Sequence, residues 1–315
     1  MTSKSVTKTT SYSIIGTGAL GGYYGARLHH GGATVRFLLH SDYDHVRTHG
    51  FKVESPQGDF SISQPEVYAH VSDLPPSDVV VVALKTTQNR LLGELLPPAT
   101  AAKATVLMMQ NGLGIEADAD AVVPGRTVLG GLAFLCSNKV GPGHIKHLDY
   151  GDIRLGQYRS DGRAGGVTPA MERVAEDFRA ADIGVDLEAD LDIARWKKLV
   201  WNVPYNGLCV ARNCTTDVIM NDPTSRQVCK DIMIEVLSIA EAYGHHIDPR
   251  FVEQMLRYTD KMARYKPSMK LDFERRLPLE LEAIYVRPLE AARAKDVACP
   301  NIAALYEELV ELDPA

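Results

Sequence analysis

The sequence lacks several patterns that would assign it to a class at once. Its five cysteines are odd in number and form no Cys-x-x-Cys pair, which argues against a disulfide framework. No run of about twenty apolar residues could span a bilayer. The polar residues 1–11 contain no apolar segment typical of a secretory signal, and we expect a flexible tail there. The ten histidines show neither His-Glu-x-x-His nor Cys/His ligand spacing. We therefore expect a cytoplasmic protein without a metal.

An excess of basic charge is also missing. Lysine and arginine number 34 against 40 aspartate and glutamate residues, so the net charge is −6. This balance predicts neither a nucleic-acid partner nor an anionic membrane partner, and any anionic ligand must be bound by a local site. The 315 residues, of which 45% are hydrophobic, are enough for a sizeable core and favour two domains over one.

Residues 12–188 alternate strand-like and helix-like segments, which is typical of a parallel sheet covered by helices. The run of valines at 79–82 has no polar face and predicts a central strand buried on both sides. Shorter alternating segments predict antiparallel hairpins at the sheet edge, with Gly58 and Gly151 as their turn residues. Thr168 and Pro169 predict the start of a last helix before a final strand. The predicted strands of the main sheet span residues 12–15, 34–39, 78–84, 104–109 and 127–132.

The hydrophobic period changes near Asp190, and no convincing strand pattern follows. Asp222-Pro223 and Asp248-Pro249 each pair a capping carboxylate with a proline suited to the first turn of a helix, and Gly244 predicts a helix end. We therefore expect an α/β, Rossmann-type dinucleotide-binding domain over residues 12–188 and an all-α domain over residues 189–315. The predicted helices of this second domain span residues 190–212, 222–246, 248–265, 277–296 and 301–312.

Three glycines form a Gly-x-Gly-x-x-Gly motif between the first predicted strand and a helix-like pattern. In a dinucleotide site the first glycine permits a tight turn, the second lets the backbone approach a pyrophosphate, and the third lets helix pack on strand. The alternative is a flexible glycine-rich turn. The position of the motif at the start of an α/β pattern favours the dinucleotide site, which we assign to Gly16, Thr17, Gly18, Ala19, Leu20 and Gly21.

The choice of dinucleotide depends on the end of the second strand, about twenty residues further on. An acidic residue there would bind the ribose hydroxyls of NAD. The sequence has His40 at this point and Asp42 slightly later, with Arg47 beyond. His40 and Arg47 suit a 2′-phosphate, whereas Asp42 suits a free hydroxyl, so the residues alone leave both cofactors open.

Lys198, Asn202 and Asn206 follow each other at four-residue steps and therefore share one face of a helix. An amine beside two carboxamides offers one proton donor and several uncharged hydrogen-bonding groups, which suits a carbonyl substrate. The alternative is a solvent-exposed edge, but such edges more often carry charged residues than asparagines of low helix propensity. Pro204 removes a backbone donor on this helix and should kink it.

Two further segments carry weaker signals. Asn111 follows a predicted strand and could face a cofactor, although Asn-Gly is first of all a turn signal. The segment from Arg264 to Tyr285 is too polar and too proline-broken for a simple core, and includes Ser268 and Glu280. Its plainer interpretation is a solvated loop between helices.

The sequence resembles the ketopantoate reductase (2-dehydropantoate 2-reductase) family over nearly its whole length. The combination of the glycine motif with the Lys-x3-Asn-x3-Asn helix and the downstream serine-to-glutamate spacing is specific to that family. In that family a Rossmann domain binds NADPH and a helical domain closes over the substrate. The matching segments read IIGTGALG, LKTTQ, QNGLG, RWKKLVWNVPYN, SMKLDFERRLPLELEAI and CPNIAALYEEL.

The resemblance implies roles for individual residues. Lys198 matches the lysine that donates a proton to the substrate C2 oxygen, and Glu280 matches the active-site glutamate, which also lines the cofactor. The substrate-binding matches are Asn111, Asn202, Asn206 and Ser268, and the cofactor-lining matches outside the glycine motif are His40, Lys85, Asn111 and Cys136. Two positions depart from the family pattern: His40 replaces a common arginine, and Thr216 replaces a further asparagine, with Asn213 nearby.

The sequence therefore predicts NADPH-dependent reduction of ketopantoate to pantoate, a step toward pantothenate and coenzyme A. One alternative is a related reductase that uses NADH or NADPH on another small oxo acid. Another is a redox sensor that binds the nucleotide without chemistry. A homodimer is possible, because apolar residues on the last helices could be buried within the chain or between two copies.

Overall fold

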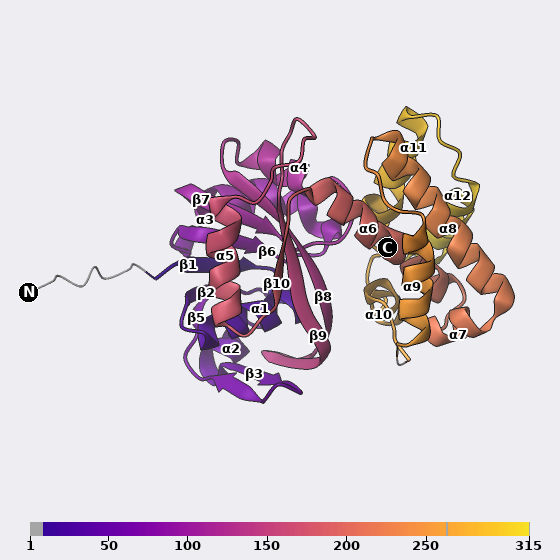
Figure 1. Ribbon diagram of the computed structural model, residues 1–315. Helices are drawn as coiled ribbons and strands as arrows, with labels where there is room; N and C mark the ends of the chain where they lie inside the picture. Colours follow the sequence, from indigo (N-terminus) through magenta and orange to yellow (C-terminus); the bar gives the residue numbers. More distant parts are fainter. Residues whose placement is uncertain (1–8, 263, 315) are drawn as a thin grey trace, which may run out of the picture. The chain divides into compact units, whose positions relative to one another are not determined.

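The computed structural model describes residues 9–262 and 264–314, which separate into two compact units (Figure 1). The sheet unit contains the chain up to Gln110 together with Glu116–Leu191, and the helical unit contains Asn111–Ile115 and the chain from Asp192 onward. Of the tail predicted at residues 1–11, residues 1–8 lie outside the described part, and Ser11 already begins the first strand.

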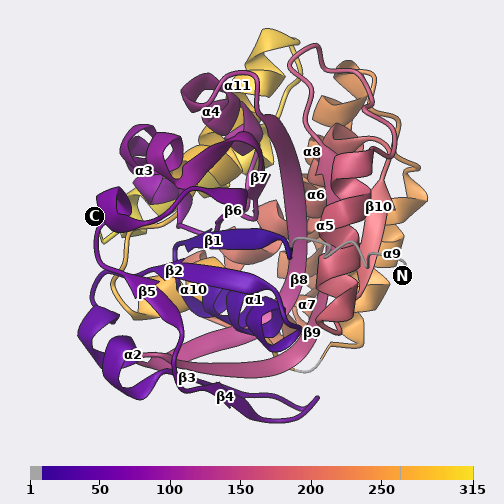
Figure 2. The ribbon, with the colours of Figure 1, turned by 90° about the vertical axis from the view of Figure 1, so that its left-hand side faces the viewer.

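Parallel strands form the centre of the sheet unit, as predicted. Figure 2 shows β7, β6, β1, β2 and β5 in succession, and β8 pairs with the outer side of β7. The valine run lies in β6 and is buried from Val80 to Val82, in agreement with a central strand. The strands in this part are β1 (Ser11–Ile15), β2 (Thr34–Leu38), β5 (Glu66–Tyr68), β6 (Ser77–Val82), β7 (Thr100–Met108) and β8 (Thr127–Gly141).

A mixed extension follows at β8, in which β8–β9 and β3–β4 pair antiparallel while β3 and β10 pair parallel with β9. Its strands are β3 (Phe51–Glu54), β4 (Phe60–Ile62), β9 (His144–Gln157) and β10 (Val185–Glu188). Gly58 lies in the turn between the antiparallel β3 and β4 with φ +115°, as predicted. The turn assigned to Gly151 is wrong. Gly151 lies inside β9 with φ +137°, where the register against β8 shifts by a bulge between Ala133 and Leu135. The actual β8–β9 turn is at residues 142–143.

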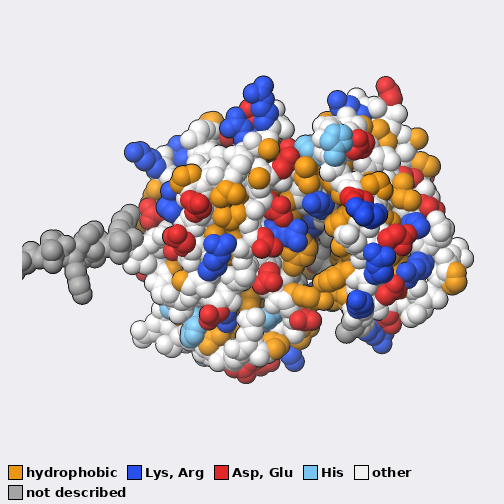
Figure 3. Space-filling view, viewed as in Figure 1, with side chains coloured by type: hydrophobic (Ala, Val, Ile, Leu, Met, Phe, Trp, Pro, Cys, Tyr) orange, Lys and Arg blue, Asp and Glu red, His pale blue; other side chains and the backbone are white. Residues whose placement is uncertain are grey.

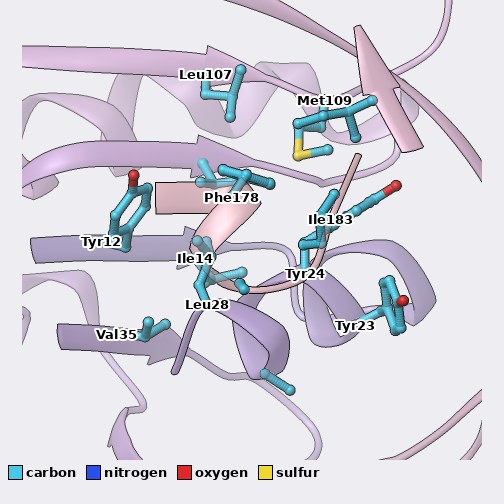
Figure 4. Close-up of a cluster of buried hydrophobic side chains, with 14 of the residues drawn as sticks. Tyr12, Ile14, Tyr23, Tyr24, Leu28, Val35, Leu107, Met109, Phe178 and Ile183 are labelled. Atoms are coloured by element: carbon cyan, nitrogen blue, oxygen red, sulfur yellow. The ribbon is translucent and has the colours of Figure 1, made fainter. Parts of the chain in front are cut away.

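Helices cover the sheet through crossover connections. Helix α1 (Ala19–His30) follows β1 and lies beside α5 (Pro169–Ala180), whose Thr168 hydroxyl accepts the Met171 amide as the predicted cap. Side chains from β1, α1 and α5, among them Tyr12, Ile14 and Phe178, fill the core between these layers (Figure 4). The other helical segments are α2 (Tyr43–His49), η1 (Val71–Asp73), η2 (Thr86–Leu91), α3 (Leu92–Ala99) and α4 (Ile115–Val122).

Within its described residues the helical unit contains no strand, as predicted. Asp222 caps α8 by accepting the Ser225 amide at 2.8 Å, and Gly244 ends that helix region with φ +82°. Helix α6 continues through Pro204. The segments are α6 (Leu191–Ala211), α7 (Thr216–Asn221), α8 (Pro223–Ala242), α9 (Arg250–Asp260), α10 (Ser268–Glu274), the π-helical turn η3 (Glu282–Val286), α11 (Arg287–Ala294) and α12 (Pro300–Leu312). No helix in the described ranges is long and apolar enough to cross a membrane.

Candidate active site

The glycine motif forms a sharp turn between β1 and α1. Gly16 has φ +95°, and a Cβ atom there would lie 2.4 Å from the backbone nitrogen of Leu84. A Cβ atom on Gly21 would lie 2.2 Å from the carbonyl oxygen of Gly16. Both positions therefore require glycine, the first for its backbone conformation and close contact, the second because helix and loop touch there.

Gly18 differs from these two glycines. It precedes α1 with φ −82°, and a Cβ atom added to it would meet nothing within 4 Å. No side chain of the N-cap residue accepts the first amides of α1, which leaves them available to a ligand. Backbone donors at a helix N-terminus with adjacent free volume fit the phosphates of a dinucleotide. The loop itself is held by Thr17, whose hydroxyl donates to the Leu38 carbonyl at 3.1 Å.

The residues after β2 separate into exposed and buried side chains. His40 is exposed, whereas Asp42 is only 6% exposed. The Asp42 Oδ2 atom pairs with Lys139 Nζ at 2.6 Å and accepts the Gly143 amide at 2.9 Å. Burial by itself would raise the pKa of Asp42, but these two contacts outweigh burial and lower that pKa. Arg47 is exposed and pairs with Asp44 at 3.7 Å.

Two other predicted cofactor residues lie on different parts of the sheet unit. Lys85 is exposed and directly precedes η2, shortly after the end of β6. Cys136 is half-buried on β8, next to Ser137, whose hydroxyl donates to the Ala19 carbonyl at 3.4 Å. The β8 strand thus passes the first residue of α1, which brings Cys136 to the same end of the sheet unit as the glycine loop.

The polar face of α6 is not a solvent-exposed edge. Asn202 and Asn206 are 6% and 2% exposed, and Lys198 one turn earlier is half-buried. Asn206 Oδ1 accepts the Met269 amide at 3.1 Å and the Ser268 hydroxyl at 3.4 Å. The first residues of α10 are therefore attached to the C-terminal part of α6.

Asn111 joins the same group of amides. Asn202 Nδ2 lies 3.5 Å from Asn111 Oδ1. The segment Asn111–Ile115 follows β7 in sequence but packs with the helical unit. The Leu113 amide donates to the Ala283 carbonyl at 2.9 Å, and a Cβ atom on Gly112 would lie 2.4 Å from the Ala283 Cβ. The sequence offered no signal for this contact, because the two partners are far apart along the chain.

Glu280 and Lys198 are the ionisable groups predicted for catalysis. Glu280 is 2% exposed and lies just before η3, the turn whose Ala283 holds Leu113. Burial, and then the positive charge of Arg195, lower the pKa of Lys198 to about 7. A lysine with this pKa is present in both protonation states near neutral pH, which a proton donor requires.

The plainer interpretation of the segment as a solvated loop is wrong for Ser268–Glu274, because these residues form the helix α10 with a buried side. Lys270 on that helix is 1% exposed, donates to Asn213 Oδ1 and pairs with Glu274 at 3.2 Å. Sequence reasoning missed Lys270, since no spacing pattern near it indicates that its side chain is buried. Thr216, at the departure from the family pattern, is also buried and donates its amide to the Tyr265 carbonyl at 3.0 Å.

Comparison with known proteins assigns the family. The model of the family described as "Ketopantoate reductase PanE/ApbA" matches residues 12–160, and that of its C-terminal domain matches residues 190–313. This chain belongs to the ketopantoate reductase family. Its members are NAD(P)H-dependent oxidoreductases that act on small keto acids. Both parts of the predicted fold are thereby confirmed.

Individual relatives agree with this assignment. A 2-dehydropantoate 2-reductase from Nostoc sp. is 49% identical over 96% of this chain and 95% of its own. The crystal structure of a 2-dehydropantoate 2-reductase from Geobacter metallireducens is 38% identical with a TM-score of 0.91, covering 96% of this chain and 99% of that chain. The protein also shares its fold with a ternary structure of D-mandelate dehydrogenase with NADH and anilino(oxo)acetate. That chain is 19% identical with a TM-score of 0.86, and the match covers 96% of this chain and 98% of that chain.

Proposed function

We propose that this protein reduces 2-dehydropantoate to pantoate with NADPH, a step toward pantothenate and coenzyme A. The observation that carries the proposal is a ketopantoate reductase match along both units, together with the buried Asn202 and Asn206 beside the half-buried Lys198 on α6. A redox sensor that only bound the nucleotide would have no use for two buried carboxamides beside an amine.

The sheet unit supplies the nucleotide site in this proposal. The open space at Gly18 and the uncapped start of α1 would take the pyrophosphate. His40 would lie near the adenosine 2′-phosphate, Lys85 would reach the phosphate end of the cofactor, and Cys136 would line it. When bound, NADPH supplies the hydride that reduces the C2 carbonyl carbon.

Lys198 is the proton donor. Its ammonium would hydrogen-bond to the C2 oxygen, stabilise the negative charge that develops there, and then give up its proton to form the hydroxyl. A pKa of about 7 suits this role, because the group loses its proton readily while remaining substantially protonated at neutral pH. Burial is the larger cause of this low pKa, and the positive charge of Arg195 lowers it further.

The buried polar residues of the helical unit would orient the substrate. Asn202 and Asn206 would hold its polar groups, and Ser268 would contact its carboxylate. Asn111, which already touches Asn202, would contact both substrate and cofactor. Glu280 would accept a hydrogen bond from a substrate hydroxyl. Uncharged amides fixed by their own hydrogen bonds lose little entropy on binding, which favours an oriented substrate.

The test is a direct assay of the purified protein. Addition of ketopantoate should cause NADPH oxidation, with kcat/KM higher than for a panel of other small 2-oxo and 3-oxo acids. A higher kcat/KM for another oxo acid would instead identify the related reductase, because a pocket with unpaired polar groups rejects the wrong substrate strongly. NADPH binding with no turnover of any oxo acid would favour the sensor.

The partner of this site is a small molecule. On the face drawn in Figure 3, acidic and basic side chains are interspersed, which suits neither a nucleic acid nor an anionic membrane as partner.

We propose that the protein forms a homodimer, because the apolar side chain of Val310 on α12 is 48% exposed. Light scattering would detect the mass of the dimer. The five cysteines form no disulfide, which suits the reducing compartment that we propose, the cytoplasm.

A further inference from the structure

Asp42 follows β2 close to the sequence position where an acidic residue would favour NADH. It lies two residues after the exposed His40, close to the position from which an acid binds the ribose hydroxyls of NAD. A carboxylate at that position normally disfavours NADPH, because it repels the 2′-phosphate. The surroundings of Asp42 therefore bear on the cofactor preference.

Three donors occupy the carboxylate of Asp42. Lys139 Nζ pairs with Oδ2 at 2.6 Å, the Gly143 amide donates to Oδ2 at 2.9 Å, and the Ser41 hydroxyl donates to Oδ1 at 3.3 Å. The Asp42 side chain is 8% exposed and that of Lys139 is 27% exposed. Both oxygens are thus engaged within the protein, and the negative charge is compensated at short range.

The contact is built into the sheet rather than made by mobile surface chains. Lys139 belongs to β8, and Gly143 lies in the β8–β9 turn with φ +61°. A Cβ atom on Gly143 would lie 2.7 Å from the Gly50 carbonyl oxygen, so the turn packs tightly against the end of α2. The Lys52 amide donates to the Gly143 carbonyl at 2.9 Å on the other side of the turn.

We propose that Lys139 is a specificity-determining residue, which neutralises Asp42 and thereby permits the 2′-phosphate of NADPH beside His40. This inference rests on the proposed function only in taking NADPH as the cofactor, and it does not depend on the substrate. Lys139 acts through Asp42, and its role is to position and compensate that carboxylate. Without Lys139, Asp42 would present an uncompensated charge to the 2′-phosphate, and NADH would be unaffected.

The experiment is a double-mutant cycle measured by nucleotide binding. The dissociation constants of NADPH and NADH are determined by fluorescence titration for the wild-type protein, Lys139→Met, Asp42→Asn and the double variant. Lys139→Met should weaken NADPH binding roughly tenfold relative to NADH, the size expected of one repulsive charge pair in a partly solvated site. Asp42→Asn keeps an acceptor for the Gly143 amide and should not weaken NADPH binding. The double variant should recover the wild-type preference.

Lys52→Met is the matched control, because it changes the net charge equally and removes an exposed lysine that pairs with Glu54 on β3. It should leave the NADPH/NADH ratio unchanged. The loss of NADPH affinity in Lys139→Met should also shrink as salt is raised, since salt screens the repulsion between Asp42 and the 2′-phosphate across a partly solvated site. A thermal unfolding curve for each variant separates binding effects from loss of folding.

Two results would overturn the inference. One is that the NADPH and NADH affinities of Lys139→Met change by the same factor. If Lys139→Met does not fold, Lys139→Gln takes its place. The other is weaker NADH binding in Asp42→Asn, which would mean that Asp42 holds the ribose itself. Failure of the proposed function has a different signature, since a protein that binds both nucleotides as expected but does not reduce ketopantoate leaves this inference standing.

Discussion

The backbone amide of Met269 donates to the side-chain Oδ1 of Asn206 at 3.1 Å, and both partners are buried. Asn206 therefore holds α10 against α6 in addition to its proposed contact with substrate. Asn206→Ala would leave the Met269 amide without this acceptor. We expect the free energy of unfolding to fall by about 1–3 kcal/mol, measured by urea denaturation. KM for ketopantoate should rise in the same variant.

Ser268→Ala separates these two effects. The Ser268 hydroxyl makes only a 3.4 Å contact to Asn206 and is half-buried, so the variant should lose less than about 1 kcal/mol of stability. If the serine contacts the substrate carboxylate, KM should nevertheless rise. Equal stability losses in the two variants would contradict the structural role assigned to Asn206.

The glycine loop gives a second prediction. Gly18→Ala places a methyl group where the protein has no atom within 4 Å and where φ is −82°, so folding should be unchanged. The same methyl group would occupy the space proposed for the pyrophosphate. We expect the dissociation constant of NADPH to rise by at least tenfold, since each 1.4 kcal/mol of lost contact is a factor of ten.

Gly21→Ala is the contrasting variant. Its methyl group would meet the Gly16 carbonyl at 2.2 Å, so either loop or helix must move. We expect a lower melting temperature by differential scanning fluorimetry, in the absence of nucleotide. A stable Gly21→Ala protein, or a Gly18→Ala protein with unchanged NADPH affinity, would argue against the division of roles between these glycines.

Local periodicity was sufficient to predict much of the architecture. The buried valines of β6, the cap at Thr168 and the α6 stripe are each determined by neighbours within one strand or one helix. The α6 stripe was informative because Asn202 and Asn206 contradict ordinary helix propensity, and both proved to be buried. Such departures from local preference can be recognised in a single sequence.

Features that depend on distant contacts could not be predicted in this way. Gly151 has the composition of a turn, but the β8–β9 register makes it a bulge within a longer strand. Asn111 looked like part of an Asn-Gly turn after β7, whereas its segment packs with Ala283. The charge on Asp42 is compensated by Lys139, and nothing near either residue in sequence identifies the other.

Glu235 on α8 offers a test of the fold away from the proposed site. Its carboxylate accepts the Asn301 and Ile302 amides, both at 2.9 Å, and so caps α12 from another helix. Glu235→Ala should lower the free energy of unfolding by about 2–5 kcal/mol, because buried donors lose a charged acceptor. The kcat of the folded enzyme should be unchanged. A loss of kcat without a loss of stability would contradict a purely structural role.

Lys198 makes the catalytic proposal sensitive to pH. With a pKa of about 7, the donor is protonated below that pH and loses its proton above it, so kcat/KM for reduction should fall about tenfold per pH unit on the alkaline side. Lys198→Met should lower kcat by about 10²–10⁴ and abolish this fall, since no other group supplies the proton directly. Lys197→Met, the same change one residue earlier, should retain both the rate and the profile. A wild-type profile that is flat from about pH 6 to 9 would exclude Lys198 as the proton donor, because its charged fraction changes most across that range.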